Sequence, residues 1–208
     1  MEETKLTFAI LLAMFFITLE CKLPAVSFGK KYDFKKFYST GMPIWTHTTT
    51  AGSSEFCEVD FKQSIRQNEI HYSHSFYQMV GGTQKKFLMQ MEGDFEKTEV
   101  MYAHEQGHVR VKFKHEMHFS DETHHCAVIR VLPMSNFVGR SSTDLRVWNS
   151  SIHTGPSKAC LKHYHSIESH GHVIYKPTCQ NLVLNKQPSL QLHQQLQGQK
   201  HPLPKGHK

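Results

Sequence analysis

The stretch between Cys126 and Cys179 decides the fold, and it combines four short patterns. They are CAVIRV (126–131), DLRVW (144–148), KACLKHY (158–164) and VIYKPTC (173–179). The first, second and fourth predict strands, because Val, Ile and aromatic side chains favour extended backbone. The third predicts a short helix. Strands and a helix that begin or end near cysteines therefore form one unit at the carboxy-terminal end of the chain.

Upstream of this unit, short segments of alternating apolar and polar residues recur between turn signals. In one of them Val59 and Phe61 alternate with Glu58 and Asp60, the pattern of a half-buried antiparallel strand. Aromatic residues spaced i, i+3, i+4 within 33–38 predict a short helix before the first strand. About eight strands fit the whole chain, and no helix–strand alternation indicates an α/β fold. We expect an all-β fold, an eight-stranded antiparallel barrel with a short N-terminal helix and a C-terminal α-helix.

The length of 208 residues, 38% of them hydrophobic, fits one domain with a substantial core. The apolar run over 6–19 is short for a membrane span and lies where a secretory signal has its apolar region. We expect a signal peptide over 1–21, cleaved between about 21 and 27, with a retained signal anchor as the alternative. A folded domain over 30–184 and a disordered polar tail over 185–208 complete the expected organisation.

The cysteine content agrees with export. Of five cysteines, Cys21 falls in the leader, and the remaining four are Cys57, Cys126, Cys160 and Cys179. None has the Cys-x-x-Cys spacing of a zinc or redox site. An even set in an exported chain predicts two disulfides, and the residues alone allow three pairings.

The formal charge of +6 raises the question of a polyanionic partner. Lys and Arg are spread along the chain, and no aromatic-interleaved basic module is present. We therefore expect neither a nucleic-acid partner nor a membrane partner. The sequon that begins at Asn149 predicts N-glycosylation at a strand end or turn.

Two histidine patterns suggest metal chemistry. Residues 104–108 read HEQGH, the spelling of the zinc-protease signature, which requires both histidines on one helical turn. Gly107 interrupts this segment and a strand pattern follows it, so we do not expect a protease. The second pattern is the pairs His124–His125, His163 with His165 and His170 with His172, which could bind a metal weakly; the other 15 of the 17 histidines, these pairs included, are interpreted as surface residues that alternate along strands. We predict that the protein is not an enzyme and that it has no catalytic residue, metal site or cofactor.

These features resemble the tick salivary lipocalins, the family that includes histamine-binding proteins. The resemblance lies in Cys126-Ala127-Val128-Ile129, in the segment from Cys160 to Tyr164 and in the closing Cys179, and it covers roughly 33–182. It implies a lipocalin β-barrel, secreted as a monomer, with one ligand cavity. It also implies the disulfides Cys57–Cys179 and Cys126–Cys160.

The sequence departs from the amine-binding members of that family at both acidic positions. Ala127 stands where Asp is expected after the cysteine, and Arg146 stands where Glu is expected. Because residues two apart on a strand share a face, Asp144, Arg146 and Trp148 should point the same way. If that face is the cavity, Arg146 would bind a carboxylate above the Trp148 indole. Arg146 could instead pair with Asp144 or face outward.

Two further residues complete the predicted ligand-binding set. Trp45 is similar to the tryptophan that closes one end of lipocalin barrels, and Tyr102 lies in a predicted strand. The expected function is sequestration of a small host inflammatory mediator. An anionic lipid, such as a leukotriene or fatty acid, is placed ahead of a biogenic amine such as histamine or serotonin. A protein–protein inhibitor that acts on host proteins through the barrel surface is the other alternative.

Overall fold

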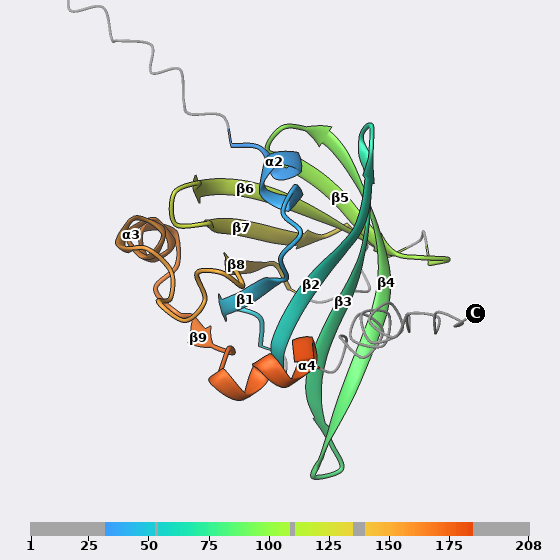
Figure 1. Ribbon diagram of the computed structural model, residues 1–208, viewed down its shortest axis with the longest axis vertical. Helices are drawn as coiled ribbons and strands as arrows, with labels where there is room; N and C mark the ends of the chain where they lie inside the picture. The colour runs from blue at the N-terminus through green and yellow to red at the C-terminus, as the bar shows by residue number, and fades with distance from the viewer. Residues whose placement is uncertain (1–31, 53, 109–110, 135–139, 185–208) are drawn as a thin grey trace, which may run out of the picture. The chain divides into compact units, whose positions relative to one another are not determined.

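The computed structural model describes residues 32–52, 54–108, 111–134 and 140–184 (Figure 1). The predicted signal peptide (1–21) and polar tail (185–208) lie outside these residues and stay predictions. In the described part of the chain, no helix has both the length and the hydropathy needed to cross a membrane.

Eight antiparallel strands close into a barrel. Consecutive strands pair as neighbours from β2 to β8, and β1 closes the ring because it pairs with both β8 and β2. A two-residue strand, β9, is added to the edge of β1. The predicted eight-stranded barrel is confirmed. The strands are β1 (Ile44–Thr49), β2 (Glu55–Arg66), β3 (Glu69–Val80), β4 (Thr83–Lys97), β5 (Val100–Glu105), β6 (Lys112–Asp121), β7 (Cys126–Pro133), β8 (Ser142–Trp148) and β9 (His172–Val173).

Short helices flank the barrel at both ends of the described chain. The helix α2 (Phe34–Tyr38) begins after Asp33, whose carboxylate accepts the Lys36 N–H at 3.0 Å. The helix α3 (Lys158–Ile167) begins after Ser157, whose hydroxyl accepts the Cys160 N–H at 3.1 Å. The short helices η1 (Pro177–Gln180) and α4 (Asn181–Leu184) follow. Both predicted helices are confirmed, and each starts with a capping side chain.

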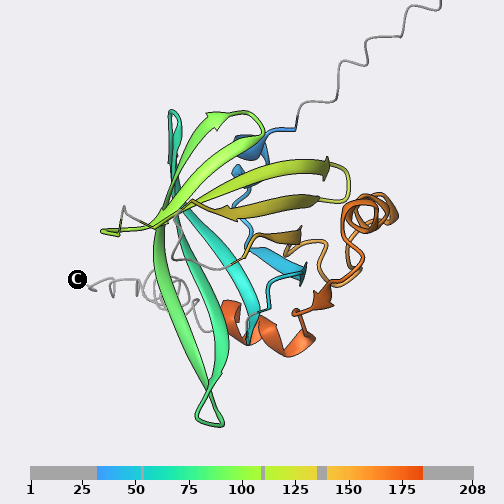
Figure 2. The same cartoon turned by 180° about the vertical axis from the view of Figure 1, so that it is seen from behind.

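The barrel wall separates two apolar clusters. Inside, Phe34 and Tyr38 of α2 pack against Ile70, Met101 and other inward side chains. Outside, a layer that includes Leu145 and Val147 of β8 lies beneath α3 and the segment around α4 (Figures 1 and 2). Because side chains alternate across a strand, burial of Leu145 and Val147 outside directs Asp144 and Arg146 into the barrel.

Two disulfides fasten the outer layer to the wall. Cys57 of β2 is bonded to Cys179 of η1, and Cys126 of β7 is bonded to Cys160 of α3. This is the pairing that the family resemblance implied. The bonds join residues 122 and 34 positions apart in the sequence, so the first constrains far more of the unfolded chain.

Removal of the Cys57–Cys179 disulfide should therefore lower the free energy of unfolding more than removal of the Cys126–Cys160 disulfide. We expect the double substitution Cys57→Ser with Cys179→Ser to lower the free energy of unfolding by about 2 to 5 kcal/mol. The loss should exceed that of Cys126→Ser with Cys160→Ser by roughly 1 kcal/mol, from the logarithm of the loop lengths. Urea unfolding of both double variants measures this. Equal losses, or the reverse order, would contradict loop closure as the main source of stability.

Candidate ligand-binding cavity

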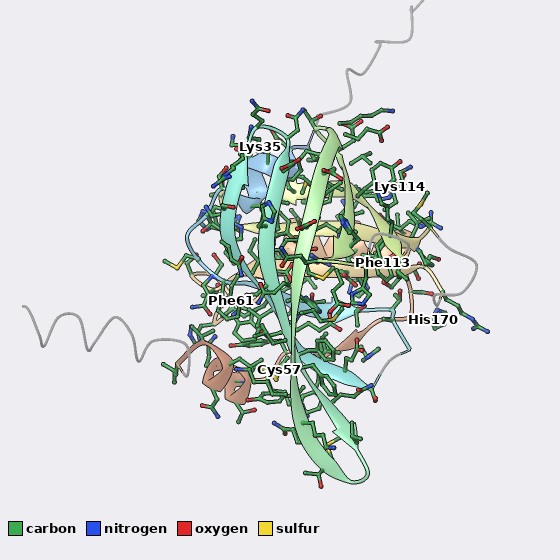
Figure 3. All side chains as sticks on the ribbon, turned by 90° about the vertical axis from the view of Figure 1, so that its right-hand side faces the viewer. Lys35, Cys57, Phe61, Phe113, Lys114 and His170 are labelled. Atoms are coloured by element: carbon green, nitrogen blue, oxygen red, sulfur yellow. A yellow bond between two sulfur atoms is a disulfide. The ribbon has the colours of Figure 1, made fainter. Side chains whose placement is uncertain are left out.

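A cavity of about 280 Å³ lies inside the barrel. It shares lining residues with a wider mouth of about 710 Å³, and Phe113, labelled in Figure 3, lines both. The inner wall combines apolar side chains with an unusual number of ionisable ones. The lining residues of the inner cavity are Thr49, Ala51, Glu55, Glu58, Asp60, Tyr72, His74, Phe76, Met89, Met91, Phe113, His115, Val131, Ser142, Asp144 and Arg146.

The guanidinium of Arg146 is the centre of the polar network in this cavity. Its Nη1 donates to Asp60 Oδ2 at 3.0 Å and to the Tyr38 hydroxyl at 2.8 Å, and its Nη2 donates to Asp144 Oδ2 at 2.9 Å. The other Asp144 oxygen accepts a hydrogen bond from Thr49 at 2.7 Å. Arg146 is only 5% exposed, so these partners rather than water compensate its charge. The two carboxylates and Tyr38 raise the pKa of Arg146 against the effect of burial.

Asp60 links Arg146 to a histidine on the neighbouring strand. His74 Nδ1 lies 2.7 Å from Asp60 Oδ1, and Tyr38 donates to Asp60 Oδ2 at 2.8 Å. Burial acts to raise the pKa of Asp60, but the hydrogen bond from His74 and the charge of Arg146 outweigh it and lower the pKa to about 2. Burial acts to lower the pKa of His74, and the hydrogen bond and charge of Asp60 reverse that effect and raise it. Asp60 is therefore a carboxylate held between the guanidinium of Arg146 and a histidine whose pKa is raised.

Glu58 has no such compensation. It faces the cavity from β2, and no side chain in the described part of the chain donates a hydrogen bond to its carboxyl group. Burial raises the pKa of Glu58 to about 7, against the attraction of His74. Burial also lowers the pKa of His115, on the same cavity wall, to about 3, so that histidine is neutral at physiological pH. Glu58 is thus a buried acid that a cationic group would stabilise.

The balance of charge in the cavity is acidic. Three buried acids, Glu58, Asp60 and Asp144, face the guanidinium of Arg146 and the imidazole of His74, whose pKa is raised by Asp60. Both oxygens of Asp60 and both oxygens of Asp144 already have partners. Of these three buried acids, Glu58 is the one left for an incoming ligand. A ligand with a positive charge would pair with Glu58, whereas an anionic ligand would have to displace a carboxylate from Arg146.

The predicted site residues fall into two groups. Asp144 and Arg146 line the cavity, as the two-residue period indicated. Trp148 does not: its indole stacks on His125 at 4.3 Å, donates to the Phe37 carbonyl at 3.1 Å and borders a separate pocket of about 190 Å³ beside α2. The Trp148 indole, which the sequence analysis expected to lie beneath a bound carboxylate, instead holds α2 against the barrel.

Trp45 and Tyr102 are also absent from the described cavity lining. Trp45 is fully buried in the outer layer, with its ring 5.1 Å from that of Tyr175. Its Nε1 donates to Asn149 Oδ1 at 2.7 Å, an oxygen that also accepts from Gln180. Tyr102 is half-buried on β5, between the inward residues Met101 and Ala103. Glycosylation of Asn149 stays a prediction.

Sequence reasoning missed most of the polar cavity. Glu58 and Asp60 were placed on the polar face of a half-buried strand, but they face inward while Val59 packs in the outer layer. The interpretation of the strand histidines as surface residues was wrong for His74 and His115, which are largely buried. A period of two residues identifies the faces of a strand without telling which face is inside, and here both faces are covered.

Residues 104–108, which match the zinc-protease signature in sequence, do not have the geometry of a zinc-protease site. His104 ends a buried stretch of β5, its Nε2 lies 3.4 Å from Glu92 Oε2, and His108 follows the turn at Gly107, whose φ is +81°. The motif therefore lies on a strand and a turn rather than on a helix. Within the described ranges, no three His, Cys, Asp or Glu side chains are grouped as metal ligands.

Comparison with known proteins gives the fold. No family model and no curated protein matches the chain. Among solved structures, AM182 in a serotonin complex aligns with a TM-score of 0.52 and 15% identity over 73% of this chain and 95% of that one. Japanin from Rhipicephalus appendiculatus, bound to cholesterol, aligns with a TM-score of 0.52 and 8% identity over 67% of this chain and 96% of that one. The chain has the lipocalin fold.

The paired state of Arg146 predicts a large stability cost for its removal. Arg146→Leu would leave Asp60 and Asp144 buried with one cation fewer, a situation that costs about 3 to 5 kcal/mol. Arg130→Leu on β7 is the matched control, because Arg130 is exposed. Urea unfolding at pH 7 compares the two. A loss for Arg146→Leu within about 1 kcal/mol of the control would show that the carboxylates do not depend on Arg146.

Proposed function

We propose that this chain is a secreted lipocalin that binds and sequesters a small molecule in its barrel, and that the preferred ligand carries a protonated amine. The observation that carries the proposal is Glu58, a buried acid with a pKa raised to about 7 and no hydrogen-bond donor among the described residues. An ammonium group beside Glu58 would offset the free-energy penalty of burying the Glu58 carboxylate. A cationic ligand gains this binding energy, and a neutral or anionic ligand does not.

The cavity walls favour a compact ligand with an apolar or aromatic body. Phe76, Met89, Met91, Phe113 and Val131 line the space around the acids. An inner volume of about 280 Å³ is at the small end of the range for ligand sites. A ring that packs on these side chains, with an amine directed to Glu58, fits both the polarity and the size.

The anionic lipid that the sequence favoured becomes the second choice. That hypothesis required a free guanidinium at Arg146, and Arg146 is shared by Asp60, Asp144 and Tyr38. Its Nε alone is buried without a partner. A carboxylate ligand would therefore enter a site where both neighbouring acids repel it.

Secretion and a role against host mediators extend this proposal. The apolar leader predicts export, and two disulfides suit an oxidising compartment. Serotonin and cholesterol occupy the AM182 and Japanin structures, which share the fold. We infer a carrier that lowers the free concentration of an amine mediator such as serotonin or histamine.

Titration calorimetry with serotonin, histamine and arachidonic acid tests the ligand class. Serotonin or histamine should bind at least about tenfold more tightly than arachidonic acid, and Glu58→Gln should lower amine affinity at least about tenfold. Glu69→Gln, an exposed acid at the start of β3, should leave it unchanged. Because Glu58 must lose its proton to pair with the amine, affinity should rise between about pH 6 and 8.

The opposite pattern would overturn the assignment. Tighter binding of arachidonic acid, with equal amine binding by wild type and Glu58→Gln, would return the site to the anionic class. A pH-independent amine affinity in wild type would show that Glu58 is not the counter-ion.

A further inference from the structure

The β3–β4 hairpin extends past the strand that follows it. β4 pairs with β3 continuously from Thr83 to Asp94, whereas its pairing with β5 begins only at Met91. Figure 3 shows the hairpin projecting beyond the rest of the barrel, and Figure 1 labels the two strands. In the described part of the chain, residues 83–89 of β4 therefore form a sheet edge with a strand on one side only.

The hydrogen-bonding groups of this edge can be assigned from one contact. The Gln106 N–H donates to the Gln90 backbone carbonyl at 2.8 Å, so the backbone N–H and C=O of Gln90 point toward the β5 side. The direction alternates along a strand, and the β3–β4 pairing shows no register shift. The N–H and C=O groups of Gln84, Lys86 and Leu88 thus point to the open side. Three residues with regular spacing present a template for an added strand.

The side chains of the hairpin combine exposed apolar surface with positive charge. Met79 and Leu88 are 49% and 51% exposed, and Val80 and Phe87 are also exposed. The segment 77–90 contains two lysines, at 85 and 86, and no acid. Phe87 stacks on Phe76 at 5.3 Å, which holds the edge extended close to the cavity wall. An extended segment that brings acids and apolar side chains would match this edge.

The same charges argue against a second copy of the chain as the occupant. An antiparallel pairing of two such edges, centred on the open groups, places Lys86 opposite Lys86 of the other copy. Like charges directly opposite each other on paired strands are destabilising. The edge is therefore complementary to an acidic segment and not to itself.

We propose that the edge of β4 over residues 83–89 docks an extended acidic segment of a partner protein by strand addition. In antiparallel pairing, adjacent acids lie opposite Lys85 and Lys86, and the two residues before them, both apolar, lie opposite Phe87 and Leu88. The partner contributes backbone hydrogen bonds to Gln84, Lys86 and Leu88. The open edge groups of Gln84, Lys86 and Leu88 are not part of the cavity lining, so this interaction does not depend on the identity of the cavity's ligand.

Fluorescence anisotropy with a labelled peptide tests the proposal. The probe is Thr-Val-Val-Glu-Glu-Thr-Val, and its control has Lys-Lys in place of Glu-Glu. Wild type should bind the acidic probe at least about tenfold more tightly than the control peptide. Leu88→Pro removes one outward N–H and should weaken probe binding by about tenfold or more, since proline is tolerated on the open side of an edge strand.

A second variant keeps the test independent of the proline. The double substitution Lys85→Glu with Lys86→Glu should abolish binding of the acidic probe and gain binding of the lysine peptide. The double substitution Lys158→Glu with Lys162→Glu, at two exposed positions of α3, is the charge-matched control and should change neither affinity by more than about twofold. Circular dichroism confirms that each variant is folded.

Four outcomes would overturn the proposal. Equal binding of both peptides by wild type would show that the edge does not select acidic segments. Equal binding of the acidic probe by wild type and the charge-reversed variant would show that Lys85 and Lys86 do not recognise it. Absence of peptide binding, with self-association of the charge-reversed variant in sedimentation, would assign Lys85 and Lys86 to protection of the edge against aggregation. Self-association of wild type that Leu88→Pro abolishes would make a second copy the occupant instead.

Discussion

The burial of Arg146 is the constraint on which the interior of this barrel depends. A guanidinium out of water needs carboxylates and hydrogen-bond acceptors in place, and the protein supplies them from three elements. Asp60 comes from β2, Asp144 from β8 itself and the Tyr38 hydroxyl from α2. Since these elements are far apart in sequence, the charge network also fixes α2 against the barrel. The apolar cluster around Phe34 and Tyr38 then fills the same end of the interior.

The chemistry of the cavity follows from how that network is completed. Arg146 and His74 compensate Asp60 and Asp144, and Glu58 is left as the buried acid of the cavity without a donor among the described residues. A single arginine on an inward face does not by itself define an anion site, because its net contribution depends on the acids around it. In this barrel the acids outnumber the cationic side chains.

Much of the architecture was predictable because local patterns determine it. Alternation and turn signals predicted the strands, and the aromatic spacing within 33–38 and the segment 158–164 predicted the two helices, which the structure shows to be capped by Asp33 and Ser157. The face of each strand was harder to predict, because strands such as β2 and β8 are covered on both sides. Val59 and Val147 are buried outside the barrel, so apolar character does not mark the interior. The two-residue period put Asp144 and Arg146 on one face, but which face lies inside, and that Glu58, Asp60 and His74 share it, requires knowledge of which strands face one another.

The acidity of Glu58 tests this account most directly. Carbon-detected NMR can follow the side-chain carboxyl of Glu58 through a pH titration, with Glu58→Gln used to assign the signal. The account predicts a pKa of about 7 in the free protein, above the usual 4.5, and a clear decrease when serotonin saturates the cavity. A pKa near 4.5 in the free protein, or one that serotonin leaves unchanged, would contradict the assignment of Glu58 as the uncompensated acid of the cavity.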